Sequence, residues 1–150
     1  MKKFFLIFIL LGCTWAFGNE IVSQESLEAA FIFNFLKFVD WQDSRPTYDI
    51  CIPDDENLRK MATGLLQGKT LNDRQIEVVD RTDNCHVLVS NNPPKSDTTL
   101  TIGDLDQGAM FEFMVIDNKL KFAINIDNIR KSKLKISSQL LNLAVARDSD

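Results

Sequence analysis

Histidine, cysteine and positive charge are scarce in this sequence. A single histidine, His86, and three cysteines among 150 residues leave few side chains for a transition-metal site or a catalytic nucleophile. The 17 Lys and Arg residues are outnumbered by 21 Asp and Glu residues, which argues against a nucleic-acid partner. With only six glycines and four prolines, the chain is neither collagen-like nor of low complexity. The composition and length therefore predict a single compact domain.

Long hydrophobic runs are also absent, except at the N-terminus. Two lysines precede the unbroken apolar run Phe4 to Leu11, and the small residues Ala16 and Gly18 suit a signal peptidase. Residues 1–18 are therefore predicted to be a cleaved secretory signal peptide. A membrane anchor is disfavoured because a spanning helix needs about 18 to 20 apolar residues. A lipobox in which Cys13 is acylated is a further alternative.

Cleavage would leave residues 19–150 as one exported domain with only two cysteines, Cys51 and Cys85. An oxidising compartment favours a disulfide between them, which would close a loop of about 35 residues. A pair of buried free thiols is the alternative, because cysteine packs like a small hydrophobic side chain. The mature chain would have 15 basic and 21 acidic residues, a net charge of −6.

Apolar residues at helical spacing predict a first helix over residues 23–41. Ser23 can cap its N-terminus, and Glu25 suits the positive end of the helix dipole. The helix has two apolar stripes: Leu27, Ala30, Phe31, Phe35 and Phe38 on one face, and Ile32, Leu36 and Val39 on another. A helix that is apolar nearly all round packs in a core or against a second subunit or partner.

The rest of the chain alternates between strand and helix patterns. We expect strands at 48–52, 75–79, 85–90, 100–102 and 135–136, and a helix up to Leu66 capped by Asp54 or Asp55. Residues 110–116 and 120–126 predict a β-hairpin turned by Asp117, Asn118 and Lys119. Asp127 can cap a short helix that ends at Arg130. Ser137 or Ser138 can cap a last helix, which carries Leu140, Leu141, Leu143 and Ala144. The pattern predicts an α/β fold: a single compact domain with a mixed, mostly parallel β-sheet and a C-terminal β-hairpin flanked by helices.

No pattern in the sequence indicates a catalytic site, a metal site or a cofactor. His86 and Cys85 are adjacent in a predicted strand, so their side chains should point to opposite faces, which disfavours a nucleophilic pair. Asp104, Asp106 and Gly108 match only part of a calcium loop. A binding or regulatory protein is therefore favoured. A small-molecule binding module with its pocket at the strand ends is the second hypothesis, and a carboxylate hydrolase is the third.

Several blocks resemble the YfiR family of small exported regulators in order and spacing. They are LEAAFIFNFLKFVDW from Leu27, GK at Gly68, CHVLVS from Cys85, LTIGD from Leu100, GAMFEF from Gly108 and KFAINIDNIRKSKLKISSQLLNLA from Lys121. The most specific stretch, KISSQLLNLA, begins at Lys135. Some relatives carry a second cysteine pair near the C-terminus, which this chain lacks.

The resemblance implies a periplasmic protein that binds the periplasmic domain of an inner-membrane diguanylate cyclase of the YfiN type and represses cyclic di-GMP synthesis. It also implies a homodimer, a link to an outer-membrane lipoprotein of the YfiB type, and sensitivity to the oxidation state of the Cys51 and Cys85 disulfide. Polar residues of the most specific block are the candidate partner-binding residues: Lys135, Ser138 and Gln139.

Overall fold

The computed structural model describes residues 22–145 of the chain. The predicted signal peptide, residues 1–18, and its alternative acylation site Cys13 lie outside these residues. Among the residues described, no helix is both long and apolar enough to cross a membrane.

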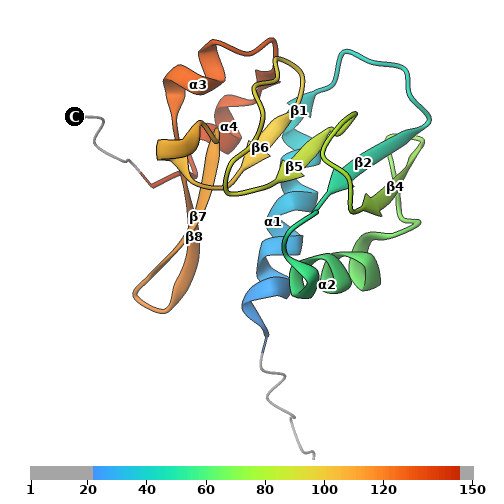
Figure 1. The fold of residues 1–150 in the computed structure, drawn as a ribbon, viewed down its shortest axis with the longest axis horizontal. Helices are drawn as coiled ribbons and strands as arrows, with labels where there is room; N and C mark the ends of the chain where they lie inside the picture. The colour runs from blue at the N-terminus through green and yellow to red at the C-terminus, as the bar shows by residue number, and fades with distance from the viewer. Residues whose placement is uncertain (1–21, 146–150) are drawn as a thin grey trace, which may run out of the picture.

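A mixed sheet lies at the centre of the described residues, with seven strands in the order β3-β4-β2-β5-β6-β7-β8 (Figure 1). The strands are β2 (Thr47–Cys51), β3 (Thr70–Leu71), β4 (Arg74–Val79), β5 (Val87–Val89), β6 (Leu100–Ile102), β7 (Phe111–Ile116) and β8 (Lys119–Ile124). The pairs from β4 to β7 are parallel, and the edge strands β3 and β8 pair antiparallel with their neighbours. The predicted α/β class and mostly parallel sheet are confirmed.

The helices surround this sheet and supply much of its core. They are α1 (Gln24–Phe38), α2 (Glu56–Leu66), the short 3-10 helix η1 (Leu105–Gln107), α3 (Ile126–Arg130) and α4 (Ser138–Leu141). Helix α1 packs against α2 and reaches β8. Its Phe35 ring is fully buried, with ring centroids 4.8 Å from Phe111 and 5.1 Å from Phe122. This aromatic group joins α1 to the β7–β8 hairpin.

Helix α1 buries only one of its two predicted apolar faces completely. Ile32 and Leu36 are fully buried together with Phe35, whereas Leu27 is exposed and Phe31 is half-buried. The face of α1 that carries Ile32 and Leu36 therefore packs in the core, and the other stripe stays partly exposed to solvent.

The end of α1 differs from the prediction. The helix ends at Phe38, and Val39–Asp40 form strand β1, which pairs antiparallel with β9 (Lys135–Ile136) in a separate two-stranded sheet. The indole Nε1 of Trp41 donates to the carbonyl oxygen of Leu36 at 3.0 Å, which occupies a carbonyl at the end of the helix. The apolar spacing continues to Trp41, but the tertiary pairing with β9 overrides it.

The helix caps match the predictions in part. Ser23 caps α1, and Asp55 rather than Asp54 caps α2. For α3 the cap is Asn125, whose side chain accepts from the Asn128 backbone, while Asp127 lies within the first turn. The prediction of Asp127 was wrong because an amide oxygen two residues earlier serves the same role.

The last helix is shorter than predicted. Ser137 is its cap, and α4 ends at Leu141 before Leu143 and Ala144. The chain then turns back, and the Val145 backbone N–H donates to the Phe122 carbonyl oxygen on β8 at 2.9 Å. This bond to the sheet edge replaces a further helical turn.

The predicted hairpin is confirmed, with a tighter turn. Asp117 and Asn118 have φ angles of 52° and 62°, as a two-residue type I′ turn requires. Lys119, predicted in the turn, is the first residue of β8 and pairs with Ile116.

Candidate functional site

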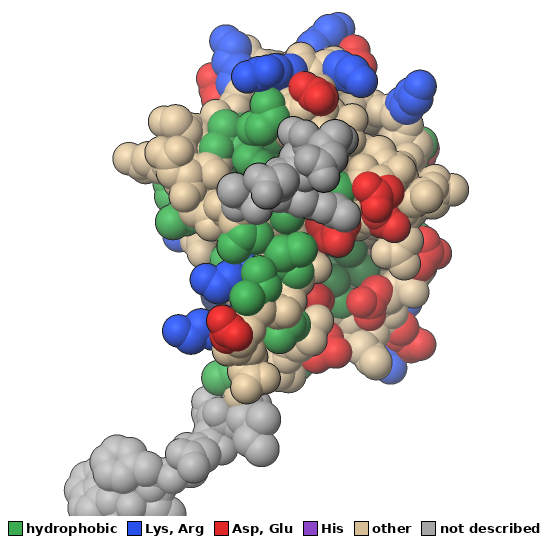
Figure 2. All heavy atoms as spheres, turned by 90° about the vertical axis from the view of Figure 1, so that its left-hand side faces the viewer, with side chains coloured by type: hydrophobic (Ala, Val, Ile, Leu, Met, Phe, Trp, Pro, Cys, Tyr) green, Lys and Arg blue, Asp and Glu red, His purple; other side chains and the backbone are tan. Residues whose placement is uncertain are grey.

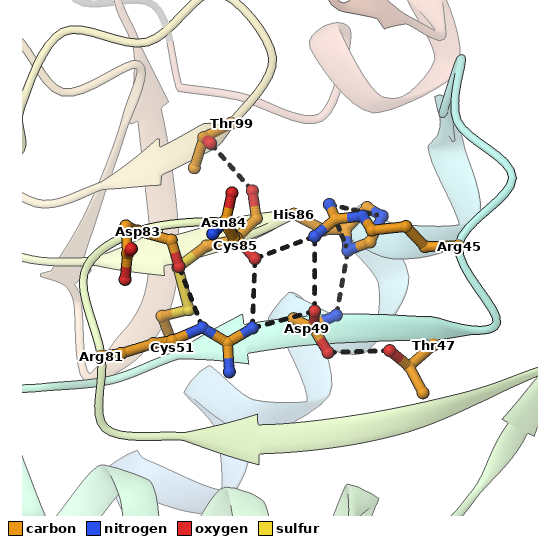
Figure 3. Close-up of a disulfide and its surroundings, with 10 residues drawn as sticks. All are labelled: Arg45, Thr47, Asp49, Cys51, Arg81, Asp83, Asn84, Cys85, His86 and Thr99. Carbon is orange, nitrogen blue, oxygen red and sulfur yellow. Dashed lines mark hydrogen bonds and ion pairs between the residues drawn. A yellow bond between two sulfur atoms is a disulfide. The ribbon is translucent and has the colours of Figure 1, made fainter.

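A disulfide joins Cys51, the last residue of β2, to Cys85, two residues before β5 (Figure 3). The two Cα atoms are 5.9 Å apart, and the cysteines are 0% and 3% exposed. The predicted pairing is confirmed, and the free-thiol alternative is wrong. The bridge packs with Leu88 and Val79 in a small apolar group separate from the main core.

His86, next to the disulfide, lies at the centre of a polar group. Its side chain is buried, and its Nδ1 accepts a hydrogen bond from the Asp49 backbone N–H at 2.9 Å. Its Nε2 is 2.8 Å from Oδ2 of Asp43. Because Nδ1 accepts, the proton of the neutral ring is on Nε2, which donates to Asp43. The rings of Trp41 and Tyr48 stand edge-on to the imidazole at 5.1 and 5.4 Å.

Two arginines connect His86 to the neighbouring loops. The Nη2 atom of Arg45 lies 3.2 Å from Nδ1 and 3.1 Å from Nε2 of His86, and its Nη1 donates to the Asn84 carbonyl oxygen at 2.9 Å. Arg81 donates to the same carbonyl oxygen at 3.2 Å and to Oδ2 of Asp49 at 3.0 Å. The buried Asp49 carboxylate is thus paired with both arginines, as Figure 3 shows for the Arg45 and Arg81 side chains.

A third arginine completes the group on the other side of Asp43. Arg74, the first residue of β4, donates from Nη1 to Oδ1 of Asp43 at 2.7 Å and from Nη2 to the Asp43 carbonyl oxygen. Its guanidinium lies over the Tyr48 ring, 4.8 Å from the centroid. We call these six residues the His86 cluster: Asp43, Arg45, Asp49, Arg74, Arg81 and His86. The cluster ties the segment before β2 to the middle of β2, to the start of β4 and to the loop between β4 and β5.

The electrostatics of the His86 cluster keep the histidine neutral. Burial lowers the pKa of His86, and the Arg45 guanidinium lowers it further, against the opposing effect of Asp43 and Asp49. Burial alone would raise the pKa of Asp43, but hydrogen bonds from the Arg45 backbone and His86 lower it below its ordinary value. Both ring nitrogens of the imidazole are hydrogen-bonded, and the neighbouring Cys85 is in a disulfide, so the cluster holds no free thiol.

A cavity of about 560 Å³ lies beside the cluster. Its lining includes Trp41, Asp43, Arg45, Thr99 and Lys133. These residues precede β2 and β6 or lie between α3 and β9, so the cavity is at the amino ends of the parallel strands. Open α/β sheets more often bind ligands at the carboxyl ends. The cavity can hold a small molecule that makes both polar and aromatic contacts.

The three predicted partner-binding residues lie outside the His86 cluster. Lys135 is in β9, Ser138 and Gln139 begin α4, and all three side chains are exposed. Of the two serines predicted as possible caps of the last helix, Ser137 is the N-cap of α4: its Oγ accepts a hydrogen bond from the Gln139 backbone N–H. Ser138 therefore does not cap the helix. Lys135 is adjacent in sequence to Leu134, which lines the cavity.

The partial calcium motif has a local structural role. Oδ1 of Asp104 accepts from the Asp106 backbone and caps η1, and Gly108 ends that helix at a φ of 96°. Within residues 22–145, no group of three or more His, Cys, Asp or Glu side chains is arranged to hold a metal ion.

Sequence reasoning did not find the His86 cluster. One signal was present: Asp49 and His86 each stand in a short apolar strand pattern, and buried polar side chains need partners. That signal could have paired Asp49 with His86. It could not have identified Arg45, Arg74 or Arg81, since nothing in the sequence around them distinguishes them from other charged residues.

Comparison with known proteins agrees with the resemblance predicted from the sequence blocks. No curated protein matches this chain. The sequence model of the YfiR/HmsC-like family matches residues 25–145, a range that contains the disulfide, the His86 cluster, the cavity and every strand of the central sheet. The chain belongs to the YfiR/HmsC-like family.

Proposed function

We propose that this protein is a periplasmic negative regulator that binds the periplasmic domain of an inner-membrane diguanylate cyclase of the YfiN type and represses cyclic di-GMP synthesis. The observation that carries the proposal is the family match over residues 25–145. A regulator of this kind needs a stable surface and no reacting group, and the neutral, fully bonded His86 is consistent with that requirement.

The partner-binding surface in this proposal is the exposed start of α4 and the adjacent β9. Lys135, Ser138 and Gln139 present an ammonium, a hydroxyl and an amide on neighbouring segments of the chain. The nearby β1–β9 pair fixes the backbone that carries Lys135. Polar groups of this kind set orientation at the rim of an interface, around an apolar centre.

The test of this function is the cyclic di-GMP content of cells that lack the protein. Deletion should raise cyclic di-GMP when a YfiN-type cyclase is present, and expression of the wild-type chain should restore the low level. An unchanged level after deletion would refute the proposed function. Binding of the purified mature protein to the periplasmic domain of that cyclase measures the contact directly.

Charge reversal tests the proposed partner contacts. Lys135→Glu combined with Gln139→Glu should abolish repression while the protein is exported and folded normally, because both side chains are exposed. Lys119→Glu combined with Gln107→Glu, at exposed positions of β8 and η1, is the matched control, because it changes the net charge by the same amount on a different part of the surface. Full repression by the Lys135/Gln139 variant would remove these residues from the interface.

Two further parts of the proposal follow from family membership. We propose that the protein acts as a homodimer and that an outer-membrane lipoprotein of the YfiB type relieves repression. Light scattering of the mature protein gives the oligomeric state, and loss of that lipoprotein should lower cyclic di-GMP. A redox-responsive role for the Cys51–Cys85 bridge remains a prediction, which reduction under native conditions tests.

The cavity beside Trp41 supports a second candidate function, binding of a small molecule. Its volume of about 560 Å³ is within the range of ligand pockets. Trp41 is the only tryptophan after the predicted signal peptide, so its fluorescence reports directly on the cavity. A ligand should raise the melting temperature and change this fluorescence. A metabolite panel that changes neither would refute this candidate.

A further inference from the structure

Five basic side chains gather at the end of the molecule that holds α3. Four of them lie in the segment from the end of α3 to the start of β9, and the fifth is in the loop before β6: Arg130, Lys131, Lys133, Lys135 and Lys95, all exposed. The Lys133 backbone N–H donates to the Asp97 carbonyl oxygen at 2.8 Å, so the loop that carries Lys95 lies against the α3–β9 segment. We call these five residues the basic face. Figure 2 shows Lys and Arg side chains crowded at the top of the molecule, where Figure 1 places α3.

Acidic residues neutralise this face only in part. Asp97 is 3.5 Å from Lys133, Asp127 is in the first turn of α3, and Asp40 is opposite Lys135 in the β1–β9 pair. Five cations against three carboxylates leave a net charge of +2. The mature chain has 15 basic and 21 acidic residues, so the rest of it is strongly negative and the charge of the molecule is polarised.

The chemistry of the basic face fits a diffuse anionic surface better than a specific carboxylate. Four of the five cations are lysines, and a lysine is a mobile point charge that does not form the two-pronged contacts of arginine. Lysine is also depleted from the centres of protein interfaces. Ile126, one helical turn before Arg130, is 38% exposed and supplies an apolar contact on the same side of α3.

We propose that the basic face binds an anionic phospholipid surface and holds the protein beside a membrane. Ammonium groups of the lysines pair with headgroup phosphates, while the acidic remainder of the protein is repelled and faces away. This property goes beyond the proposed function, because it requires neither a cyclase nor a ligand in the cavity.

The experiment is sedimentation of the mature protein with vesicles. One set contains phosphatidylethanolamine and phosphatidylglycerol in a 3:1 ratio, and the other contains phosphatidylcholine alone. Each net positive charge near an anionic surface strengthens partition by about fivefold, so two charges give about a 25-fold preference at low salt. High salt should abolish it, because exposed charges are screened. Equal partition into both vesicles would overturn the proposal.

Two double variants with the same change in net charge locate the binding surface. Lys95→Glu with Lys131→Glu reverses the basic face without touching the cavity lining or the proposed partner contacts. Lys119→Glu with Lys121→Glu changes β8 near the hairpin turn, which lies at the lower end of Figure 1, and is the control. The first variant should lose the preference for anionic vesicles and the second should keep it.

The outcomes separate this proposal from the proposed function. Equal losses in the two variants would mean that overall charge rather than the basic face governs binding, which overturns the proposal. If the wild type ignores vesicles but the Lys95/Lys131 variant no longer binds the cyclase domain, the basic face contacts a protein and the lipid proposal is wrong. The effect of deleting the protein on cyclic di-GMP is independent of all these results.

Discussion

Reduction of the Cys51–Cys85 bridge should destabilise the protein strongly. The two cysteines are separated by 34 positions in the chain, so the bridge restricts a long loop of the unfolded state. In the chain-entropy treatment, a loop of this size contributes about 4 kcal/mol to the free energy of unfolding. A domain of this length is stable by only about 5 to 15 kcal/mol, so reduction should remove a large share of the total.

The bridge should also resist reductant while the protein is folded. Cys51 is completely buried and Cys85 is 3% exposed, so a thiolate reaches the sulfur atoms only after local or global opening. Opening near Cys85 must disturb the Asn84 carbonyl oxygen, which accepts hydrogen bonds from Arg45 and Arg81. Reduction should therefore be slow under native conditions and accelerate in urea.

The assay is urea unfolding of the mature protein with and without reductant, followed by far-UV circular dichroism. A Cys51→Ala/Cys85→Ala variant is the control, since reductant should not move its midpoint. The reasoning is refuted if reduction lowers the free energy of unfolding by less than about 1 kcal/mol, well below the loop estimate. Rapid reduction of the native protein without loss of structure would instead support the redox-responsive role.

Three other predictions concern the cluster, a close contact and the core. Because the pKa of His86 is lowered in the fold, the unfolded chain binds the proton more tightly, so the free energy of unfolding should fall as pH drops below about 6.5. The lowered pKa of Asp43 adds a further loss below about pH 4. A pH titration of urea midpoints with His86→Gln should lack the first loss and show a smaller second loss, because His86 also lowers the pKa of Asp43. Gly103→Ala places a Cβ 1.9 Å from a backbone oxygen, so it should lower the free energy of unfolding by about 2 to 3 kcal/mol, as measured by chemical denaturation. Gly64→Ala is the control: there is open space around Gly64, so this substitution should raise the free energy of unfolding by about 0.5 to 1 kcal/mol. Phe35→Ala should lower the free energy of unfolding by about 3 to 5 kcal/mol, and a loss below about 1 kcal/mol would contradict the packing described for that ring.

Elements with a strong local signal could be predicted from the sequence. Ser23 and Asp55 cap their helices because a short polar side chain precedes an apolar periodic segment. The hairpin was predictable because Asp117 and Asn118 separate two β-rich runs and tolerate positive φ. Strands β1 and β9 differ, since each has two residues and exists only through the other. The local pattern predicted a strand at 135–136, but it assigned Val39 and Asp40 to the first helix and did not show that the two segments pair.

The candidate site was likewise predictable only in part. The disulfide was predictable because the expected removal of residues 1–18 leaves two cysteines, which have one possible pairing. The His86 cluster was not, since Asp43 and Arg45 come from the irregular segment between β1 and β2, whose path depends on tertiary contacts. The exposed positions of Lys135, Ser138 and Gln139 agree with a binding role, but exposure alone does not assign a partner.

The β1–β9 pair also determines which part of the domain can fold last. An exported chain enters the compartment in which it folds with its N-terminus first, so Val39 arrives well before Ile136, its partner in the pair. Cys51, Cys85 and the parallel core strands β2, β4 and β5 all precede β9 in the chain, so they are present before that pair can form. The surface around β9 therefore forms last, and a chain truncated before Lys135 would keep its disulfide while lacking the segment proposed to contact a partner.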